Sequence, residues 1–194
     1  MKKIAIAIAF FLAIPSLALA DKYKLDHAHT RVGFEVSHMA VSTVEGHFKK
    51  FTGSYDFNHR RNILKDVKVE IEAASIDTNK KKRDAHLSGD DFFSAEKHPK
   101  ITFVSTGKTK VRKGRWVRVK GKLTMRGVTR TVYLMVKYRG RIKTPWKFYK
   151  TGFDAKLRVN RYHYGVKWNK KLALGNLMVG KMVDIKIRVE GDAK

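Results

Sequence analysis

Residues 183–190 read VDIKIRVE, an unbroken alternation of apolar and charged side chains. Successive side chains of an extended strand point to opposite faces of a sheet, so this stretch predicts a strand with one apolar and one charged face. Such strands are typical of antiparallel sheets that pack one face against a core and expose the other to water. The stretch therefore indicates a protein built from half-buried β-strands.

The same period of two recurs along most of the chain. It is found in residues 31–37, 66–72, 116–125 and 131–138, and residues 48–57, 101–105 and 148–159 are further strand candidates. We expect turns at Arg126-Gly127 and Arg139-Gly140, because glycine permits the backbone angles of a tight reversal. Together these segments predict an all-β architecture of about eight antiparallel strands.

One segment departs from this rhythm. The polar run that follows Thr78 predicts a short helix with Thr78 as its N-cap, and Pro99 marks the return to extended structure. Leu87, Phe92 and Phe93 place large apolar side chains beside this helix. We expect a helical insertion that plugs the core or covers the mouth of a cavity.

The N-terminus has the layout of a secretory signal peptide. Lys2 and Lys3 precede an eleven-residue apolar run, residues 4–14, which is followed by the small residues around Ala20. This run is shorter than the ~20 apolar residues that span a bilayer as a helix. We expect cleavage after Ala20, one mature domain over residues 21–194 and a periplasmic location. Removal of residues 1–20 would leave a net charge of +24, since only Lys2 and Lys3 are charged there.

Composition restricts the class of protein further. The chain of 194 residues has a net charge of +26, no cysteine and 43% hydrophobic residues. The absence of thiols excludes disulfides, zinc-thiolate sites and a cysteine nucleophile, and the apolar content is too high for a disordered polycation. The basic residues are dispersed and accompany no nucleic-acid-binding motif, so we expect no nucleic-acid partner.

Several short motifs, taken together, resemble the YceI-like family. Residues 26–30 (DHAHT) and 44–48 (VEGHF) are similar to its opening, 75–78 (SIDT), 83–87 (RDAHL) and 99–105 (PKITFVS) to its centre, and 121–129 (GKLTMRGVT) with Asn160-Arg161 to the remainder. The resemblance spans nearly all of residues 23–191. It implies an eight-stranded antiparallel lipocalin-like barrel with a short helical insertion, in a periplasmic protein that holds a polyisoprenoid chain.

The resemblance implies an isoprenoid lipid as the ligand, either a polyprenol, a polyprenyl phosphate or a prenylated quinone, and no other cofactor. An eight-stranded barrel has room for one slim ligand, and burying hydrocarbon contributes about 0.8 kcal/mol per CH₂ group. We expect the inward apolar side chains to line the cavity, with Phe92 and Phe93 at its mouth. The candidates are Val32, Phe34, Val36, Val44, Phe48, Phe92, Phe93, Phe103, Met125, Leu134 and Val136. For each of them an ordinary place in a filled core is the alternative.

Four polar residues are candidate contacts to a ligand headgroup: His38, Arg83, His86 and Arg161. For the Arg83–His86 cluster the alternative is a set of hydrogen bonds that fixes the insertion to the barrel. Strand alternation would place His27 and His29 on one face, but two imidazoles need a third ligand to hold zinc or copper. We therefore expect no metal site.

An exported isoprenoid carrier is the leading hypothesis, and it includes docking of the basic run Lys80–Arg83 on an anionic membrane. A basic surface- or membrane-binding protein with a filled barrel is the second. A hydrolase acting on polyprenyl pyrophosphate is the third. The chain has no G-x-S-x-G, H-E-x-x-H or phosphate-binding loop motif, so we expect a binding protein and not an enzyme.

Overall fold

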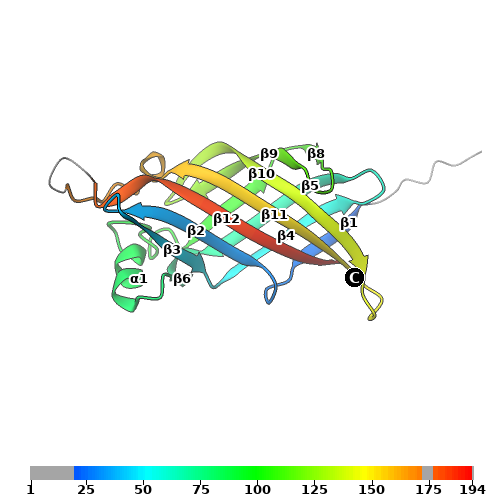
Figure 1. Ribbon diagram of the computed structural model, residues 1–194, viewed down its shortest axis with the longest axis horizontal. Coiled ribbons are helices and arrows are strands. Elements are labelled where there is room, and N and C mark those ends of the chain that lie inside the picture. Colours follow the sequence, from blue (N-terminus) through cyan, green and yellow to red (C-terminus); the bar gives the residue numbers. More distant parts are fainter. Residues whose placement is uncertain (1–19, 172–176, 194) are drawn as a thin grey trace, which may run out of the picture.

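A computed structural model describes residues 20–171 and 177–193, and β-strands dominate both ranges (Figure 1). The predicted signal peptide, residues 1–20, lies outside these ranges except for Ala20. Within the two ranges no helix combines the length and the apolar character needed to cross a bilayer.

Eight antiparallel strands close into a barrel. In order around the wall they are β1 (Asp21–Leu25), β4 (Phe51–Asn58), β5 (Ile63–Glu72), β7 (Lys100–Ser105), β9 (Trp116–Met125), β10 (Val128–Lys143), β11 (Tyr149–Asn160) and β12 (Val179–Ala193). The ring closes where β1 pairs with β12, with Lys24 opposite Asp192. The predicted all-β barrel is confirmed.

A hairpin extends the wall beyond the point of closure. It consists of β2 (Arg31–His38) and β3 (Ser42–Phe48). β2 pairs with β12 between Val179 and Arg188, whereas β1 pairs with Gly191 and Asp192 of the same strand. The strand predicted over residues 48–57 is confirmed as β4 except at its start, because the chain bends at Lys49-Lys50 and Phe48 belongs to β3. The backbone N–H of Lys49 donates to the carbonyl of Ser75 there, and that bond replaces pairing within the wall.

The two predicted turns have different outcomes. Arg126 and Gly127 form a two-residue turn between β9 and β10 with φ angles of 49° and 74°, the left-handed geometry of tight hairpins. Arg139-Gly140 is not a turn, because β10 continues through it with a register shift between Tyr138 and Gly140. The extra residue makes a bulge, and the chain reverses at residues 144–148 instead.

The helical insertion covers one end of the barrel, which we call the α1 end (Figure 1). It contains η1 (Ala73–Ser75), β6 (Ile76–Asp77) paired with β3, and α1 (Lys81–Ser88). The helix begins after Lys80, so the prediction of Thr78 as N-cap is wrong. The Thr78 backbone N–H and hydroxyl bond the Asp84 carboxylate, which holds that threonine inside the insertion instead.

Aromatic side chains close the opposite end, which we call the floor. Tyr23 and Phe57 have no exposed surface there, and the rings of Tyr55, Tyr138 and Phe153 pack around them with ring centres 4.9–6.5 Å apart. The Tyr55 and Thr151 hydroxyls share a buried hydrogen bond of 2.6 Å. β8 (Lys108–Lys110) lies outside the ring and pairs with β5.

Candidate binding cavity

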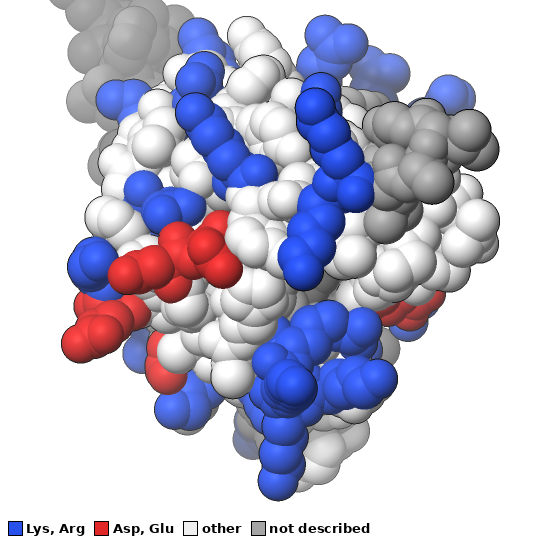
Figure 2. Space-filling model, turned by 90° about the vertical axis from the view of Figure 1, so that its left-hand side faces the viewer, with Lys and Arg blue, Asp and Glu red and all other residues white. Residues whose placement is uncertain are grey.

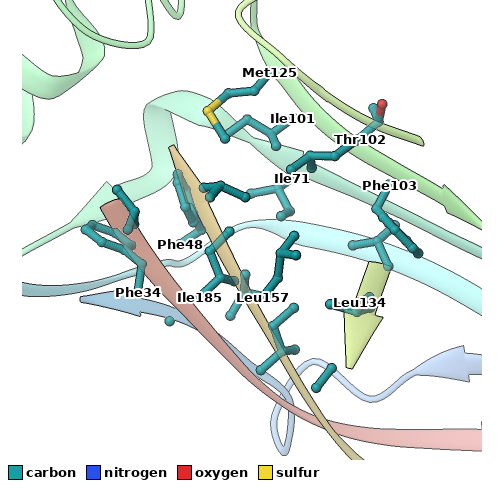
Figure 3. A pocket seen from close by; sticks show the side chains of 18 of the residues that line it. Phe34, Phe48, Ile71, Ile101, Thr102, Phe103, Met125, Leu134, Leu157 and Ile185 are labelled. Carbon is teal, nitrogen blue, oxygen red and sulfur yellow. The ribbon is translucent and has the colours of Figure 1, made fainter. Parts of the chain in front are cut away.

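An apolar cavity of about 200 Å³ runs between the floor and the α1 end, inside the barrel (Figure 3). Side chains from most of the strands and from the insertion line it, and the surface that faces it is apolar. Closely packed cores contain few voids larger than a water molecule, so a cavity of this size is more than ordinary core packing leaves. The barrel is therefore not a filled core.

The structure brings most of the apolar candidates together in this wall. They are Val32, Phe34, Val36, Phe48, Phe92, Phe93, Phe103, Met125, Leu134 and Val136. Val44 lies outside the wall: it pairs with Val36 on the hairpin, and on its other side β3 pairs with β6 only at His47 and Phe48. Their contact with a ligand stays a prediction.

The residue list drawn from the sequence missed much of the wall. β5 contributes Val67, Val69 and Ile71, β11 contributes Ala155, Leu157 and Val159, and β12 contributes Val183, Ile185, Ile187 and Val189. The period-two pattern that located these strands also marks these side chains, since every second residue points inward. Taking the inward-pointing residues of every alternating segment as candidates would have included these side chains.

Two strand glycines make room for aromatic rings in the wall. Phe34 pairs directly with Gly46, where an added Cβ would lie 2.4 Å from the Phe34 Cζ atom. Gly121 pairs with Ser105 and lies diagonally across from Phe103, whose Cζ atom would lie 2.4 Å from an added Cβ. A side chain at either position would collide with the ring, so both glycines keep the rings against the wall.

Arg161, in η2 (Arg161–Tyr164), is the one polar candidate that lines the cavity. It is 4% exposed, and its guanidinium donates to the carbonyls of Val166, Trp168 and Gly180 at 2.9 Å and of Val179 at 3.2 Å. Burial lowers its pKa, and no carboxylate pairs with it among the described residues. Arg161 therefore ties η2 and the following loop to the start of β12.

The other polar candidates lie outside the wall. Arg83 donates to the hydroxyl and the carbonyl of Thr78 at 2.7 and 2.6 Å, which fastens α1 to the strand before it. The His86 ring packs edge-on against Phe92 and Trp168, and its Nε2 atom lies 2.9 Å from an Asp91 carboxylate oxygen. His38 ends β2 and is half-buried. These contacts organise the α1 end, and headgroup binding by these residues stays a prediction.

The two predicted histidine neighbours do not share a strand face, so that expectation is wrong. Residues 26–30 form a turn between β1 and β2, because β1 ends at Leu25 and β2 starts at Arg31. The His27 ring stacks on Phe51 at 4.4 Å, whereas His29 Nδ1 lies 2.8 Å from an Asp26 carboxylate oxygen.

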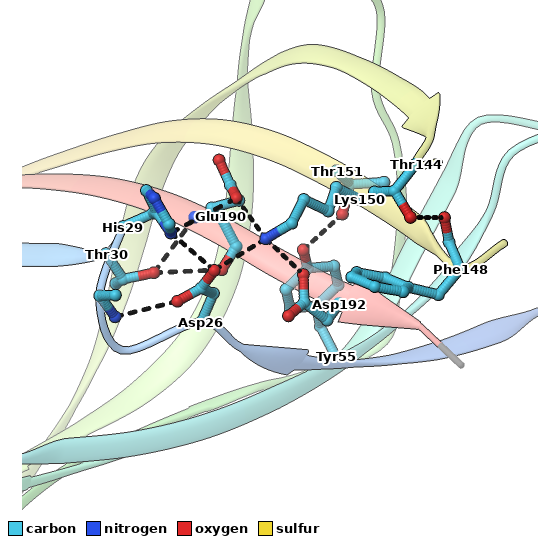
Figure 4. Close-up of polar contacts among 11 residues, drawn as sticks. Asp26, His29, Thr30, Tyr55, Thr144, Phe148, Lys150, Thr151, Glu190 and Asp192 are labelled. Atoms are coloured by element: carbon cyan, nitrogen blue, oxygen red, sulfur yellow. Dashed lines mark hydrogen bonds and ion pairs between the residues drawn. The ribbon is translucent and has the colours of Figure 1, made fainter. Parts of the chain in front are cut away.

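A polar cluster joins this turn to the floor end of the barrel (Figure 4). The ligating atoms of Asp26, His29 and Glu190 lie within 4.8 Å of one another, close enough to share one cation. Lys150 already supplies a cation: its Nζ atom is 2.8 Å from Asp26, 2.6 Å from Glu190 and 3.0 Å from Asp192. Burial alone would raise the pKa of Asp26, but hydrogen bonds from Lys150 and His29 hold that pKa well below its ordinary value.

Comparisons with known proteins place the chain in one family. The sequence profile described as the YceI-like domain matches residues 23–191. A UPF0312 protein of Photorhabdus laumondii is 36% identical over 84% of this chain and 86% of its own length. A UPF0312 protein of Azotobacter vinelandii is 32% identical over 96% of this chain and 95% of its own length.

Solved structures share the fold. The Campylobacter jejuni YCEI protein is 31% identical with a TM-score of 0.71, over 88% of this chain and 96% of its own. Burkholderia cenocepacia BcnA is 25% identical with the same TM-score, over 86% and 98%. A polyisoprenoid binding domain from Saccharophagus degradans is 17% identical with a TM-score of 0.62, over 91% and 99%. The chain, matched over nearly all of its barrel, therefore belongs to the YceI-like family.

Proposed function

We propose that this protein is an exported carrier that holds an isoprenoid lipid inside its barrel. The observation that carries the proposal is the closed barrel with an apolar cavity. A Saccharophagus degradans domain with the same fold bears the name polyisoprenoid binding, which supports the choice of ligand class. The signal-peptide pattern of residues 1–20 supports export to the periplasm.

The chemistry of the wall favours a hydrocarbon chain over a polar molecule. Three of the residues that line the cavity carry a polar group: Thr102, Arg161 and Tyr55, whose buried hydroxyl bonds Thr151. The other lining residues are apolar or glycine. A polar ligand would lose its hydrogen bonds to water and find no replacement there. A prenyl chain loses none, and each buried CH₂ group contributes about 0.8 kcal/mol.

The ligand enters at the α1 end in this proposal. The floor is closed by Tyr23 and Phe57, which have no exposed surface, whereas Leu87 and Phe93 of the insertion are half-buried beside the cavity. A lipid with a polar headgroup would therefore place its chain toward the floor and its headgroup near the insertion.

The wall gives little support to the alternative of an enzyme. Catalysis of hydrolysis needs a nucleophile, a base and donors to a developing oxyanion that converge on one point. The described wall residues include no histidine and no carboxylate. Retention of a ligand is the chemistry that this cavity fits.

The test compares two tryptophan substitutions at neighbouring positions of β7. Phe103 is 8% exposed and faces the cavity, whereas Val104 is 43% exposed and faces outward. Protein purified without detergent is analysed by native mass spectrometry, followed by lipid extraction. We expect a bound isoprenoid lipid in the parent protein, a large loss in Phe103→Trp and full retention in Val104→Trp.

Thermal unfolding of the same variants separates a blocked cavity from a damaged fold. Overpacking a filled core costs about 1–3 kcal/mol, so a loss of stability in Phe103→Trp without any lipid in the parent protein would reject the carrier. Turnover of added polyprenyl pyrophosphate would favour the enzyme instead.

A further inference from the structure

Large apolar side chains are exposed at the α1 end, on the tip of the β2–β3 hairpin. Val41 is 87% exposed and Met39 38%, and Met182 of β12 is 39% exposed. Met39 and Ala40 have φ angles of 54° and 61°, in the left-handed region that normally selects glycine or asparagine. The tip therefore carries apolar residues at positions where exposure to water favours polar residues and the left-handed backbone favours glycine or asparagine.

The strand β12 and the loop before it lie against this tip. The backbone N–H of Met39 donates to the Met178 carbonyl at 2.8 Å. The backbone N–H of Met178 in turn donates to the Lys170 carbonyl at 2.9 Å. His38 of β2 pairs with Val179 of β12. The register between the two strands then shifts between Val179 and Val183, the stretch that includes Met182. Met39 thus lies against the chain at the start of β12, the strand that also carries Met182, and we call Met39, Val41 and Met182 the apolar tip.

Exposed lysines surround the apolar tip. Lys170, Lys171 and Lys181 come from the adjoining loop and strand, and none of them has an acidic partner within 4 Å among residues 20–171 and 177–193. Lysines 80–82 at the start of α1 are also exposed and without an acidic partner in these ranges. Figure 2 shows this end of the molecule, where Lys and Arg side chains spread over much of the face and most of the visible acidic side chains lie at its left.

We propose that the α1 end docks on an anionic lipid bilayer, with the apolar tip entering the interface and the lysines contacting headgroups. Exposed apolar residues that are ringed by lysines match a surface with negative headgroups above hydrocarbon. The inference rests on the proposed function, because docking would bring the ligand opening to the membrane that supplies or receives the lipid. It assigns the docking contact to the hairpin, beyond the basic run Lys80–Arg83 predicted from the sequence.

The hairpin at the floor end is the natural rival. Its tip exposes Ile142 at 67% and Trp146 at 75%. The Trp146 ring stacks on Phe148, and the nearby cations Arg141 and Lys150 are neutralised by Asp21 and by the carboxylates of the polar cluster. Lys143 and Lys147 of this hairpin are exposed and form no ion pair among the described residues, so free charge does not separate the two tips. The difference is that the floor beside this hairpin is closed by Tyr23 and Phe57.

The absence of cysteine allows a single fluorescent label at either tip. Val41→Cys and, as matched control, Trp146→Cys are each labelled with a polarity-sensitive fluorophore and mixed with vesicles of phosphatidylglycerol and phosphatidylethanolamine. We expect a blue-shifted emission, quenched by lipid-tail quenchers, only for the label at position 41. Emission unchanged at both positions, or shifted only at position 146, would overturn the proposal.

Vesicle sedimentation measures the contribution of each part. The pair Met39→Gln with Val41→Asn should weaken binding about tenfold, and Lys170, Lys171 and Lys181→Gln together should weaken it about a hundredfold. Ile142→Asn should leave binding unchanged. Binding to neutral phosphatidylcholine vesicles that equals binding to anionic ones would contradict the role of the lysines.

Native mass spectrometry of the same preparations separates this inference from the carrier proposal. Bound lipid without vesicle docking rejects the docking surface and leaves the carrier intact. Docking at position 41 without bound lipid supports the docking surface and rejects the carrier.

Discussion

One lysine, Lys150, balances three carboxylates at the floor end of the barrel. Its side chain is 20% exposed and contacts Asp26, Glu190 and Asp192 within 3.0 Å. Hydrogen bonds to these acids raise the pKa of Lys150 although burial alone would lower it. We expect Lys150→Met to lower the free energy of unfolding at pH 7 by about 2–3 kcal/mol, because the carboxylates would be left partly buried without a cation.

The pH dependence of this effect follows from Asp26. Its pKa is lowered in the folded state, so its contribution to stability is present at neutral pH and is lost as the pH falls below about 4. The difference between parent and Lys150→Met should therefore shrink as the pH falls from 7 to about 3. Urea unfolding across this range measures it. Lys186→Met, which removes an exposed pair with Glu35, is the control and should change little.

At the scale of the elements, the β2–β3 hairpin offers a matched pair of glycines. An added Cβ at Gly46 would lie 2.4 Å from the Phe34 ring, whereas at Gly33 its nearest contact would be the Lys186 carbonyl at an ordinary 3.4 Å. We expect Gly46→Ala to cost about 1–3 kcal/mol and to push the Phe34 ring toward the cavity, which would lower the amount of retained lipid. Gly33→Ala should keep both properties, and equal losses in the two variants would contradict this account.

The whole molecule carries a net charge of +26, or +24 after removal of residues 1–20. Like charges repel in the compact state, and salt screens them over a Debye length of about 8 Å at physiological ionic strength. We expect Tm to rise by roughly 2–4 °C between about 20 mM and 0.5 M sodium chloride, which corresponds to about 1 kcal/mol for a domain of this size. Differential scanning fluorimetry measures this, and a falling Tm would mean that ion pairs such as Asp154 with Lys137 outweigh the repulsion.

Strand positions and the inward face follow from the sequence by itself, because the direction of successive side chains is a local property of extended backbone. The alternation in residues 183–190 and 116–125 was enough to place β12 and β9 and to mark side chains such as Ile185 and Val119 as inward. The tight turn at Arg126-Gly127 is local too. The resemblance carried by the short motifs gave the family and the barrel.

Only the tertiary structure decided where the barrel wall bends, where the ring closes and where the polar cluster around Lys150 forms. The bend at Lys49-Lys50 and the bulge at Gly140 depend on which strand lies alongside, and a single sequence does not state its partners. Asp26, Lys150 and Glu190 come from distant parts of the chain and meet only because β1 closes the ring onto β12. The cavity has the same cause. A pattern of inward apolar side chains is equally typical of a filled core and of a pocket. The space is left because the ring closes around an interior that its inward side chains do not fill.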